Sequence, residues 1–293
     1  MKDYLLLLLA ALLLACDFAM NKLYQKQAGT SLRAGFGFNA VVGILTAVLC
    51  FCINGFTFHF SWYSLIMATA MAVLLIAYIL LGFRILKAGS MALYTLFLMT
   101  GGMTVPYVWG LLFLDEPFSV WRTLGLLLII FAVALSNLGG GKTNFRQLVL
   151  CLAIFLLNGM TSVVSKLHQI ETAQDTVNAM EFVLLVGLLK FVLAGAGYLI
   201  FTWKDRKTQA EAPRGSVKLL LPVFVGSALA GGLAYALQLM GAANLPATVL
   251  YPFVTGGSMV FSTLVGILFF REKPSKALIL GVALCFVGTL LFL

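Results

Sequence analysis

The chain has 293 residues, of which 62% are hydrophobic and only 10% are charged, and its mean hydropathy is +1.05. Soluble domains are about 45–50% apolar and about 25% charged, so a fold that faces water would leave far too much apolar surface exposed. The net charge of +9 would suit a nucleic-acid partner, but the basic residues stand singly between apolar runs. Composition therefore excludes a soluble protein, argues against nucleic-acid binding, and predicts an integral membrane protein.

The first apolar segment, residues 4–24, resembles a lipoprotein signal peptide because a leucine-rich run leads to Cys16. A signal peptide begins with a positively charged region, whereas here Lys2 is offset by Asp3. The apolar run also continues past Asp17. We therefore interpret this segment as a first membrane helix that is retained in the protein.

Nine further segments have the length and hydropathy of membrane helices. Crossing a hydrocarbon core of about 30 Å takes roughly 20 mostly apolar residues. The ten predicted helices cover residues 4–24, 33–54, 62–84, 90–113, 119–138, 146–168, 177–202, 217–240, 246–269 and 276–293. Only the loop from Lys204 to Ser216 is long and polar, so we expect an all-α polytopic membrane protein without a soluble domain.

Short motifs recur in the same order in the two halves of the chain. The matching pairs are residues 21–25 with 165–169, Gly43 with Gly187, residues 100–102 with 255–257, and residues 115–117 with 272–274. Each match is weak alone, but their shared order indicates a duplication. We therefore predict a five-helix repeat over residues 1–139, a linker over 140–145, and a second repeat over 146–293.

A repeat with five helices enters the membrane the second time in the inverted orientation, and the charges of the loops agree. The loop after the first helix carries Lys26 and Arg33, whereas its counterpart after the sixth helix carries only acidic residues. Lysine and arginine accumulate in cytoplasmic loops. The odd-numbered loops hold most of these residues, and the opposite side holds only Lys2 and Arg122. We therefore predict two inverted repeats, with both termini outside the cytoplasm.

One stretch of the second half carries the most specific resemblance to a known family. It comprises residues 243–247, Tyr251-Pro252, residues 271–275 and Gly281. In residue order and spacing it is similar to the second repeat of the EamA-type branch of the drug/metabolite transporter superfamily. The first half resembles the same family more loosely, through residues 113–117 and Gly125. The resemblance implies a ten-helix transporter that exports metabolites or drugs.

The chain departs from that family in two respects. The fourth predicted helix has no proline equivalent to Pro252 and carries Pro106 further along. The family usually places both termini in the cytoplasm, whereas the lysines and arginines here predict the opposite orientation. We base the predicted orientation on these charges, because the imbalance is large and the loops are short.

Charged residues inside membrane helices are costly and usually face a cavity. Asp17 lies inside the first helix, with Asn21 on the same face at i+4; it either binds a proton or a cationic group or forms a structural pair with a lysine. Glu181 either lines a vestibule or is an interfacial carboxylate. Lys190 either neutralises Asp17 or binds an anionic group of a substrate. Lys166, nearer a helix end, is expected to extend to the lipid headgroups.

Uncharged polar residues form stripes along three helices. Inverted repeats place a substrate site near the midplane of the bilayer, so these faces are expected to meet around a shared cavity. The alternative is helix packing through small and hydroxyl-bearing residues. The stripe residues proposed for the site are Asn158 and Ser162 in the sixth helix, Tyr235 and Gln238 in the eighth, and Tyr251, Thr255 and Ser258 in the ninth.

These observations favour a secondary transporter that alternates access between the two sides of the membrane. The expected substrate is a small cationic or zwitterionic solute such as an amine, a quaternary ammonium compound or an amino acid. Proton exchange at Asp17 or Glu181 would couple its export. The alternatives are a flippase for a lipid-linked carrier and a membrane scaffold that transports nothing.

Enzymatic and cofactor chemistry is not expected. Residues 139–143 resemble the end of a nucleotide-binding P-loop, but Ser136 occupies the position of its first glycine and no strand precedes it. The sequence shows no pattern typical of metal ligands or of a catalytic nucleophile with its base. The expected partners are the solute and the lipids of a bacterial cytoplasmic membrane, with the protein acting as a monomer or a homodimer.

Overall fold

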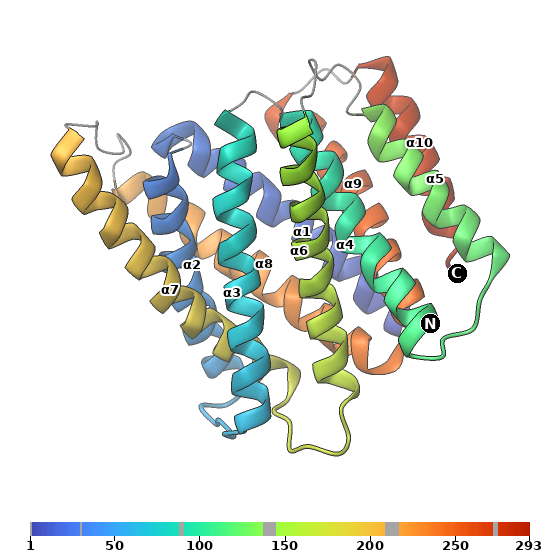
Figure 1. Cartoon of the computed structure of the whole chain (residues 1–293), viewed down its shortest axis with the longest axis horizontal. Coiled ribbons are helices and arrows are strands. Elements are labelled where there is room, and N and C mark those ends of the chain that lie inside the picture. Colours follow the sequence, from blue (N-terminus) through green and yellow to red (C-terminus); the bar gives the residue numbers. More distant parts are fainter. Residues whose placement is uncertain (1, 30, 88–90, 137–144, 209–216, 272–274) are drawn as a thin grey trace.

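The computed structural model describes residues 2–29, 31–87, 91–136, 145–208, 217–271 and 275–293, and Figure 1 shows their arrangement. These residues contain helices and no strand. The ten helices are α1 (Lys2–Ala28), α2 (Leu32–Ile53), α3 (Trp62–Lys87), α4 (Met91–Phe113), α5 (Val120–Ser136), α6 (Phe145–Ile170), α7 (Ala179–Thr208), α8 (Val217–Asn244), α9 (Ala247–Phe270) and α10 (Lys276–Leu290).

Each predicted span coincides with one of these helices, which confirms the all-α polytopic membrane fold. Eight of the described helices are long and apolar enough to cross a membrane. The other two, α5 and α10, are equally apolar but shorter, with 17 and 15 residues. The proposed linker over residues 140–145 lies outside the described residues except for its last position.

The helices pack mainly across the two predicted halves. The largest interfaces join α2 to α7, α1 to α8, α4 to α6, α5 to α10, α1 to α9, α3 to α6 and α4 to α9. Each helix of the first half has a counterpart five places later in the second half, for example α6 for α1 and α8 for α3. The α1–α8 interface thus has its counterpart in the α6–α3 interface, and every other interface in this set either has such a counterpart or joins a helix to its own counterpart. Two structurally equivalent repeats would produce this pattern, although the residue boundaries of the repeats stay a prediction.

The crossing of α2 and α7 depends on Gly43 and Gly187, the two glycines that the internal repeat aligned. A Cβ added to Gly43 would lie 2.8 Å from the carbonyl oxygen of Gly187, and a Cβ added to Gly187 would lie 2.8 Å from that of Gly43. Small residues allow membrane helices to approach this closely. The two halves are therefore in backbone contact at equivalent positions.

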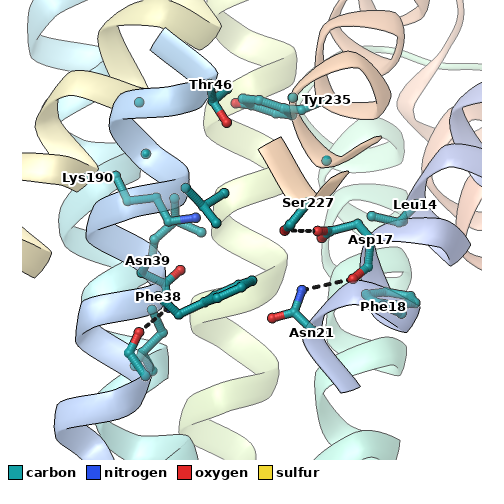
Figure 2. Close-up of a pocket in the computed structure, with 18 of the residues that line it drawn as sticks. Leu14, Asp17, Phe18, Asn21, Phe38, Asn39, Thr46, Lys190, Ser227 and Tyr235 are labelled. Carbon is teal, nitrogen blue, oxygen red and sulfur yellow. Dashed lines mark hydrogen bonds between the residues drawn. The ribbon is translucent and has the colours of Figure 1, made fainter. Parts of the chain in front are cut away.

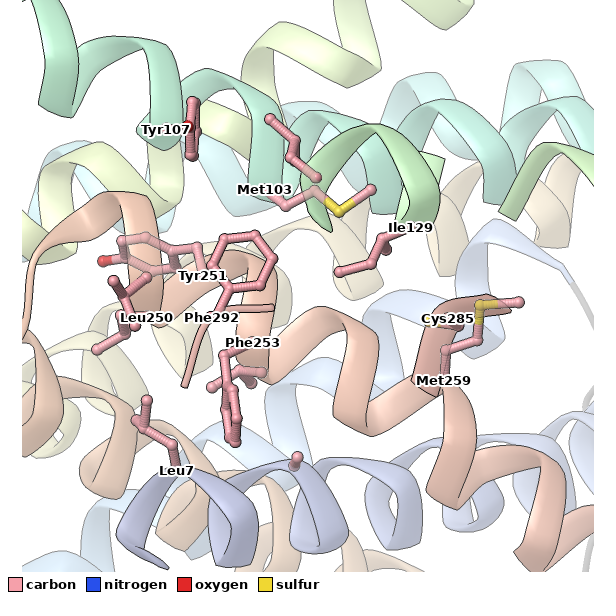
Figure 3. Close-up of a cluster of buried hydrophobic side chains, with 14 of the residues drawn as sticks. Leu7, Met103, Tyr107, Ile129, Leu250, Tyr251, Phe253, Met259, Cys285 and Phe292 are labelled. Carbon is pink, nitrogen blue, oxygen red and sulfur yellow. The ribbon is translucent and has the colours of Figure 1, made fainter. Parts of the chain in front are cut away.

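A large apolar core lies among α1, α4, α5, α9 and α10, and Figure 3 shows its side chains. Leu7 of α1, Ile129 of α5 and Leu250 of α9 are fully buried there. In Figure 1 the N-terminal end of α1 and the C-terminal end of α10 point in the same direction as the α2–α3 and α6–α7 loops. This core stabilises one part of the bundle, while the cavity described below occupies another.

Candidate functional site

A cavity of about 510 Å³ lies between α1, α2, α3, α4, α7 and α8. This volume is within the range of about 300–1,000 Å³ that is typical of small-molecule sites. At one end the cavity reaches the α1–α2 turn, where Gly29 and Gly35 line it. Toward the other end its lining includes Met71 of α3, Val183 of α7 and Gln238 of α8. The lining therefore runs from the α1–α2 turn into the interior of the bundle and includes no residue of the α2–α3 or α6–α7 loop.

Asp17 brings a carboxylate from α1 into this cavity, as Figure 2 shows. Its Oδ1 accepts a hydrogen bond from the hydroxyl of Ser227 on α8. Behind it lies Gly231, where an added Cβ would be 3.1 Å from the Asp17 carboxyl carbon. The absence of a side chain at Gly231 therefore leaves room for the carboxylate between α1 and α8.

Lys190 extends from α7 on the opposite wall, and Figure 2 shows its amino group directed toward the side that carries Asp17. The two charges interact electrostatically across the cavity. Within the part of the chain that the structure describes, no hydrogen bond or ion pair engages the Lys190 ammonium. The cavity thus contains a carboxylate and an ammonium that face each other without direct contact.

Three amide side chains add polar groups to the lining. Each of them donates to the backbone carbonyl four residues earlier in its own helix: Asn21 to Asp17 at 3.1 Å, Asn39 to Gly35 at 2.9 Å, and Gln238 to Ala234 at 3.3 Å. Their amide oxygens have no hydrogen bond to other described residues. They are therefore available as acceptors for a bound molecule.

Most of the remaining lining is apolar or aromatic. The aromatic residues that line the cavity are Phe18, Tyr24, Phe38, Tyr78, Tyr94 and Tyr235. The hydroxyl of Tyr235 lies 2.8 Å from Ser165 Oγ and so joins α8 to α6 at the inner end of the cavity. The cavity combines a few convergent polar groups with a largely apolar wall, which is the usual composition of a ligand site.

Five of the eleven residues proposed from sequence line this cavity: Asp17, Asn21, Lys190, Tyr235 and Gln238. Ser227 was not proposed from sequence, because it reaches Asp17 only through the packing of α8 against α1. Asn39 was also missed, although an asparagine within an apolar helix is a signal of the same kind as Asn21.

The polar stripe of α6 packs against α4 and is not part of the lining of this cavity. Asn158 donates to the carbonyl oxygen of Leu98 at 2.7 Å, and Ser162 donates to that of Gly102 at 3.2 Å. A Cβ at Gly102 would lie 2.6 Å from the Asn158 amide nitrogen. The glycine allows α4 to approach so closely that its backbone satisfies the polar side chains of α6.

The stripe of α9 likewise does not line the cavity. Tyr251 donates its hydroxyl to the carbonyl oxygen of Ser162 at 2.6 Å, and Ser258 donates to the carbonyl oxygen of Thr255 at 2.9 Å. The α6 and α9 stripes meet at Ser162 and Tyr251 in this packing contact. α4 packs against both helices.

Glu181 is buried at the end of the bundle opposite the α1–α2 turn. Its Oε1 accepts from Asn54 Nδ2 at 3.2 Å and from the backbone N–H of His59 at 2.9 Å, and its Oε2 accepts from the backbone N–H of Asn178 at 3.1 Å. The carboxylate therefore links the α2–α3 loop to the start of α7. Glu181 does not line the cavity.

Further contacts join the α2–α3 and α6–α7 loops, and we call residues 54–64 and 168–181 the closed end. His59 Nε2 lies 2.8 Å from Asp175 Oδ2, and Ser61 Oγ donates to the Asp175 carbonyl. Ser64 Oγ lies 2.9 Å from His168 Nε2. The hydrogen bond to the Asp175 carboxylate, together with its charge, raises the pKa of His59 above its ordinary value of 6.5.

Lys166 does not extend to the headgroups, contrary to the sequence-based expectation. It is buried, and its Nζ donates to the carbonyl oxygens of Ala242 and Leu245, each at 2.7 Å. Ala242 lies in the last turn of α8, whose backbone acceptors have no partner within the helix, and Leu245 directly follows that helix. Lys166 therefore caps α8, where its charge also complements the helix dipole.

Glu116 performs the complementary role at the start of α9. Its Oε1 accepts from the backbone N–H of Ala247 at 2.6 Å, and its Oε2 accepts from that of Thr248 at 2.8 Å. Two of the unpaired amides at the N-terminus of the helix are satisfied in this way. Glu116 and Lys166 together stabilise the α8–α9 turn.

Among the described residues, no group of three His, Cys, Asp or Glu side chains is placed to bind a metal.

Comparisons with known proteins match both the second half and the whole fold. A model of the EamA-like transporter family matches residues 146–293. A solved structure described only as the crystal structure of a protein has a TM-score of 0.76 and 17% sequence identity, and the match covers 99% of this chain and 97% of that one. At this identity the likeness shows a shared fold. The search of curated proteins finds no match.

Proposed function

Because the chain belongs to the EamA-like transporter family of the drug/metabolite transporter superfamily and is therefore a membrane transporter, we propose that the cavity between α1, α2, α7 and α8 is its solute site. The solute is a small organic molecule with an ammonium group. The protein moves it by secondary active transport and exports it. Each of these statements rests on the features described in turn below.

The observation that carries the proposal is that most hydrogen-bond acceptor positions of the Asp17 carboxylate are unused within the described chain. An ionised carboxylate has about four acceptor positions, and Asp17 uses one of them for Ser227 within the described chain. A charged group inside a membrane protein is costly unless it is paired or serves a function. A cationic group bound in the cavity would supply the missing partners.

The two ends of the cavity support alternating access. One end reaches the α1–α2 turn, whereas the hydrogen bonds of the closed end join the two halves on the opposite side. A transport cycle requires that this second side open while the first closes. The backbone contact of Gly43 with Gly187 lies beside the cavity, and we propose it as the point about which the halves rock.

Coupling and direction follow from Asp17 and from the loop charges. In the proposed cycle Asp17 carries either a proton or the solute ammonium, so that the two move in opposite directions. Glu181 is a weaker coupling candidate, because three hydrogen bonds already engage it. The cavity reaches the side that is rich in lysine and arginine, which we propose to be cytoplasmic. A site loaded from the cytoplasm fits an exporter.

The test is solute-driven proton flux through purified protein in liposomes of known orientation. The panel consists of amines, quaternary ammonium compounds and amino acids. We expect flux with one solute class in the unchanged protein and its loss in Asp17→Asn. The matched control is Asp115→Asn, the same change at an exposed carboxylate in the α4–α5 turn. Asparagine tolerates the positive φ of 50° there.

Two outcomes would count against the proposal. Flux in Asp17→Asn equal to that of the control variant would remove Asp17 from the coupling step. Absence of flux across the panel in folded protein, together with bound lipid in the cavity, would favour the lipid-carrier flippase instead.

A further inference from the structure

The charge opposite Asp17 distinguishes this cavity from a simple site for cations. α1 packs mainly on α8 and α9, whereas α7 packs mainly on α2 and α3. Asp17 and Lys190 are therefore supported by different parts of the bundle, and the cavity separates them. A structural salt bridge would bring the two groups into direct contact, and among the described residues no ion pair joins them.

Each of the two charged side chains lies against a glycine of a neighbouring helix. An added Cβ at Gly231 of α8 would be 3.1 Å from the Asp17 carboxyl carbon. An added Cβ at Gly43 of α2 would be 3.4 Å from the Lys190 Cβ. The missing side chain at Gly231 leaves room for the Asp17 carboxylate, and the Lys190 Cβ lies within contact distance of α2 at Gly43.

The hydrogen-bonding capacity of Lys190 is unused. An ammonium carries three donors and no acceptor, and within the described chain none of these donors has a partner. A charged group inside a membrane protein is costly unless it is paired or serves a function. An occupant with an anionic oxygen close to α7 would satisfy these donors.

Net charge favours the same kind of occupant. When Asp17 is ionised, its charge and that of the Lys190 ammonium cancel. A monovalent cation bound at Asp17 would leave one positive charge in a largely apolar cavity, where charge is costly. A zwitterion would leave the site neutral and pair both side chains.

We infer that the cavity selects a zwitterionic solute, and that Lys190 is the residue that determines this selectivity. The solute ammonium binds Asp17 beside α1 and α8, and the solute carboxylate binds Lys190 on α7. The apolar remainder of the solute lies against rings such as Phe18 and Phe38. This inference rests on the proposed function, because it assigns the substrate class of the same cavity.

The experiment compares matched pairs of compounds by isothermal titration calorimetry on the purified full-length protein. Leucine, glutamine and phenylalanine are each compared with the amine that lacks the carboxylate, namely 3-methylbutylamine, 4-aminobutanamide and 2-phenylethylamine. We expect at least one amino acid to bind at least tenfold more tightly than its amine. In Lys190→Met this preference disappears through weaker binding of the amino acid, and in Lys190→Arg it returns.

The possible results separate this inference from the proposed function. Amines that bind as tightly as the amino acids, or a preference that survives in Lys190→Met, would overturn the role of Lys190 and leave an amine transporter. Binding of neither class to folded protein would overturn both. Lys190→Gln serves as the second neutral variant if Lys190→Met does not fold. Weaker binding of all six compounds in Asp17→Asn, with the preference retained, would support separate roles for the two charges.

Discussion

Lys166 with Glu116 and Asp17 with Lys190 are two pairs of oppositely charged residues whose surroundings differ. Lys166 donates to two carbonyls at the end of α8, and Glu116 accepts from two amides at the start of α9. Asp17 accepts one hydrogen bond, from Ser227, and in the described chain Lys190 makes none. The first pair is satisfied by backbone groups, whereas the second faces a cavity.

The difference teaches that a charge inside a membrane protein does not by itself mark a functional site. Helix ends leave backbone groups without partners, and a buried charge can satisfy them. Such a charge stabilises the fold and has little capacity left for a ligand. Asp17 and Lys190 differ from Glu116 and Lys166 because they line a cavity and most of their hydrogen-bonding groups have no partner within the described chain.

The largest expected effect of a single substitution is on transport, in Asp17→Asn. Removing one partner of a buried, hydrogen-bonded charge pair costs about 2–5 kcal/mol of binding, which corresponds to a loss of about 30-fold or more. We expect the thermal stability to stay within about 1 kcal/mol of the unchanged protein, because the shape and the Ser227 contact persist. Flux assays and thermal melts in detergent measure the two quantities. If Asp17→Asn unfolds, Asp17 has a structural role like that of Glu116 and Lys166.

The second comparison sets Lys166→Met against Lys190→Met in the same melts. Lys166→Met leaves the carbonyls of Ala242 and Leu245 unpaired, and each buried unsatisfied group costs about 1–3 kcal/mol. Lys190→Met removes a charge that has no hydrogen bond to lose within the described chain, so its stability is expected to be equal or higher. Equal destabilisation by the two changes would contradict the proposal that Lys166 has a structural role and Lys190 does not.

The third prediction concerns Glu116→Gln, which retains one acceptor oxygen but removes the charge at the start of α9. Acidic groups near a helix N-terminus contribute about 0.3–1 kcal/mol, and up to about 2 kcal/mol where they are partly buried. We expect a loss of stability of about 1 kcal/mol in equilibrium unfolding and no change in solute selectivity. The control is Asp115→Asn in the same turn. Altered selectivity in Glu116→Gln would show that the α8–α9 turn takes part in recognition.

The sequence was sufficient to predict the ten helices, since length and hydropathy are properties of consecutive residues. It also identified Asp17 and Lys190, because charges are rare in apolar segments. It could not identify Ser227, which contacts Asp17 only after α1 packs on α8. The periodicity of the sequence shows that Asn158 lies on a polar face of its helix, but it does not show what this face contacts. We therefore predicted a cavity there, whereas Asn158 contacts the backbone of α4.

A further prediction concerns the closed end, in which polar groups are satisfied by each other. Glu181→Gln weakens the charge-assisted hydrogen bonds to Asn54 and His59, and each such bond contributes about 1.5–3 kcal/mol. The closed end should therefore open more often. We expect the fully buried thiol of Cys50, near the end of α2, to react several-fold faster with a water-soluble maleimide. An unchanged labelling rate would argue against a gate at this end.

The smallest expected effect is the pH dependence of the same end. His59 faces the carboxylates of Asp175 and Glu181, and the pKa of His59 is raised mainly by its hydrogen bond to Asp175. The stabilisation by this pair is therefore complete below pH 6.5, the ordinary pKa of histidine, and is lost as the pH rises through the higher pKa of the folded state.

The effect is small because the side chains of His59 and Asp175 are 61% and 67% exposed, so that water and salt screen the pair. Cys50 labelling is expected to rise modestly as the pH rises above 6.5, after correction for thiolate formation with a cysteine peptide of the same local sequence. His59→Gln should remove this rise while keeping its backbone hydrogen bond to Glu181. A rise that persists in His59→Gln would assign the pH dependence of the closed end to another group.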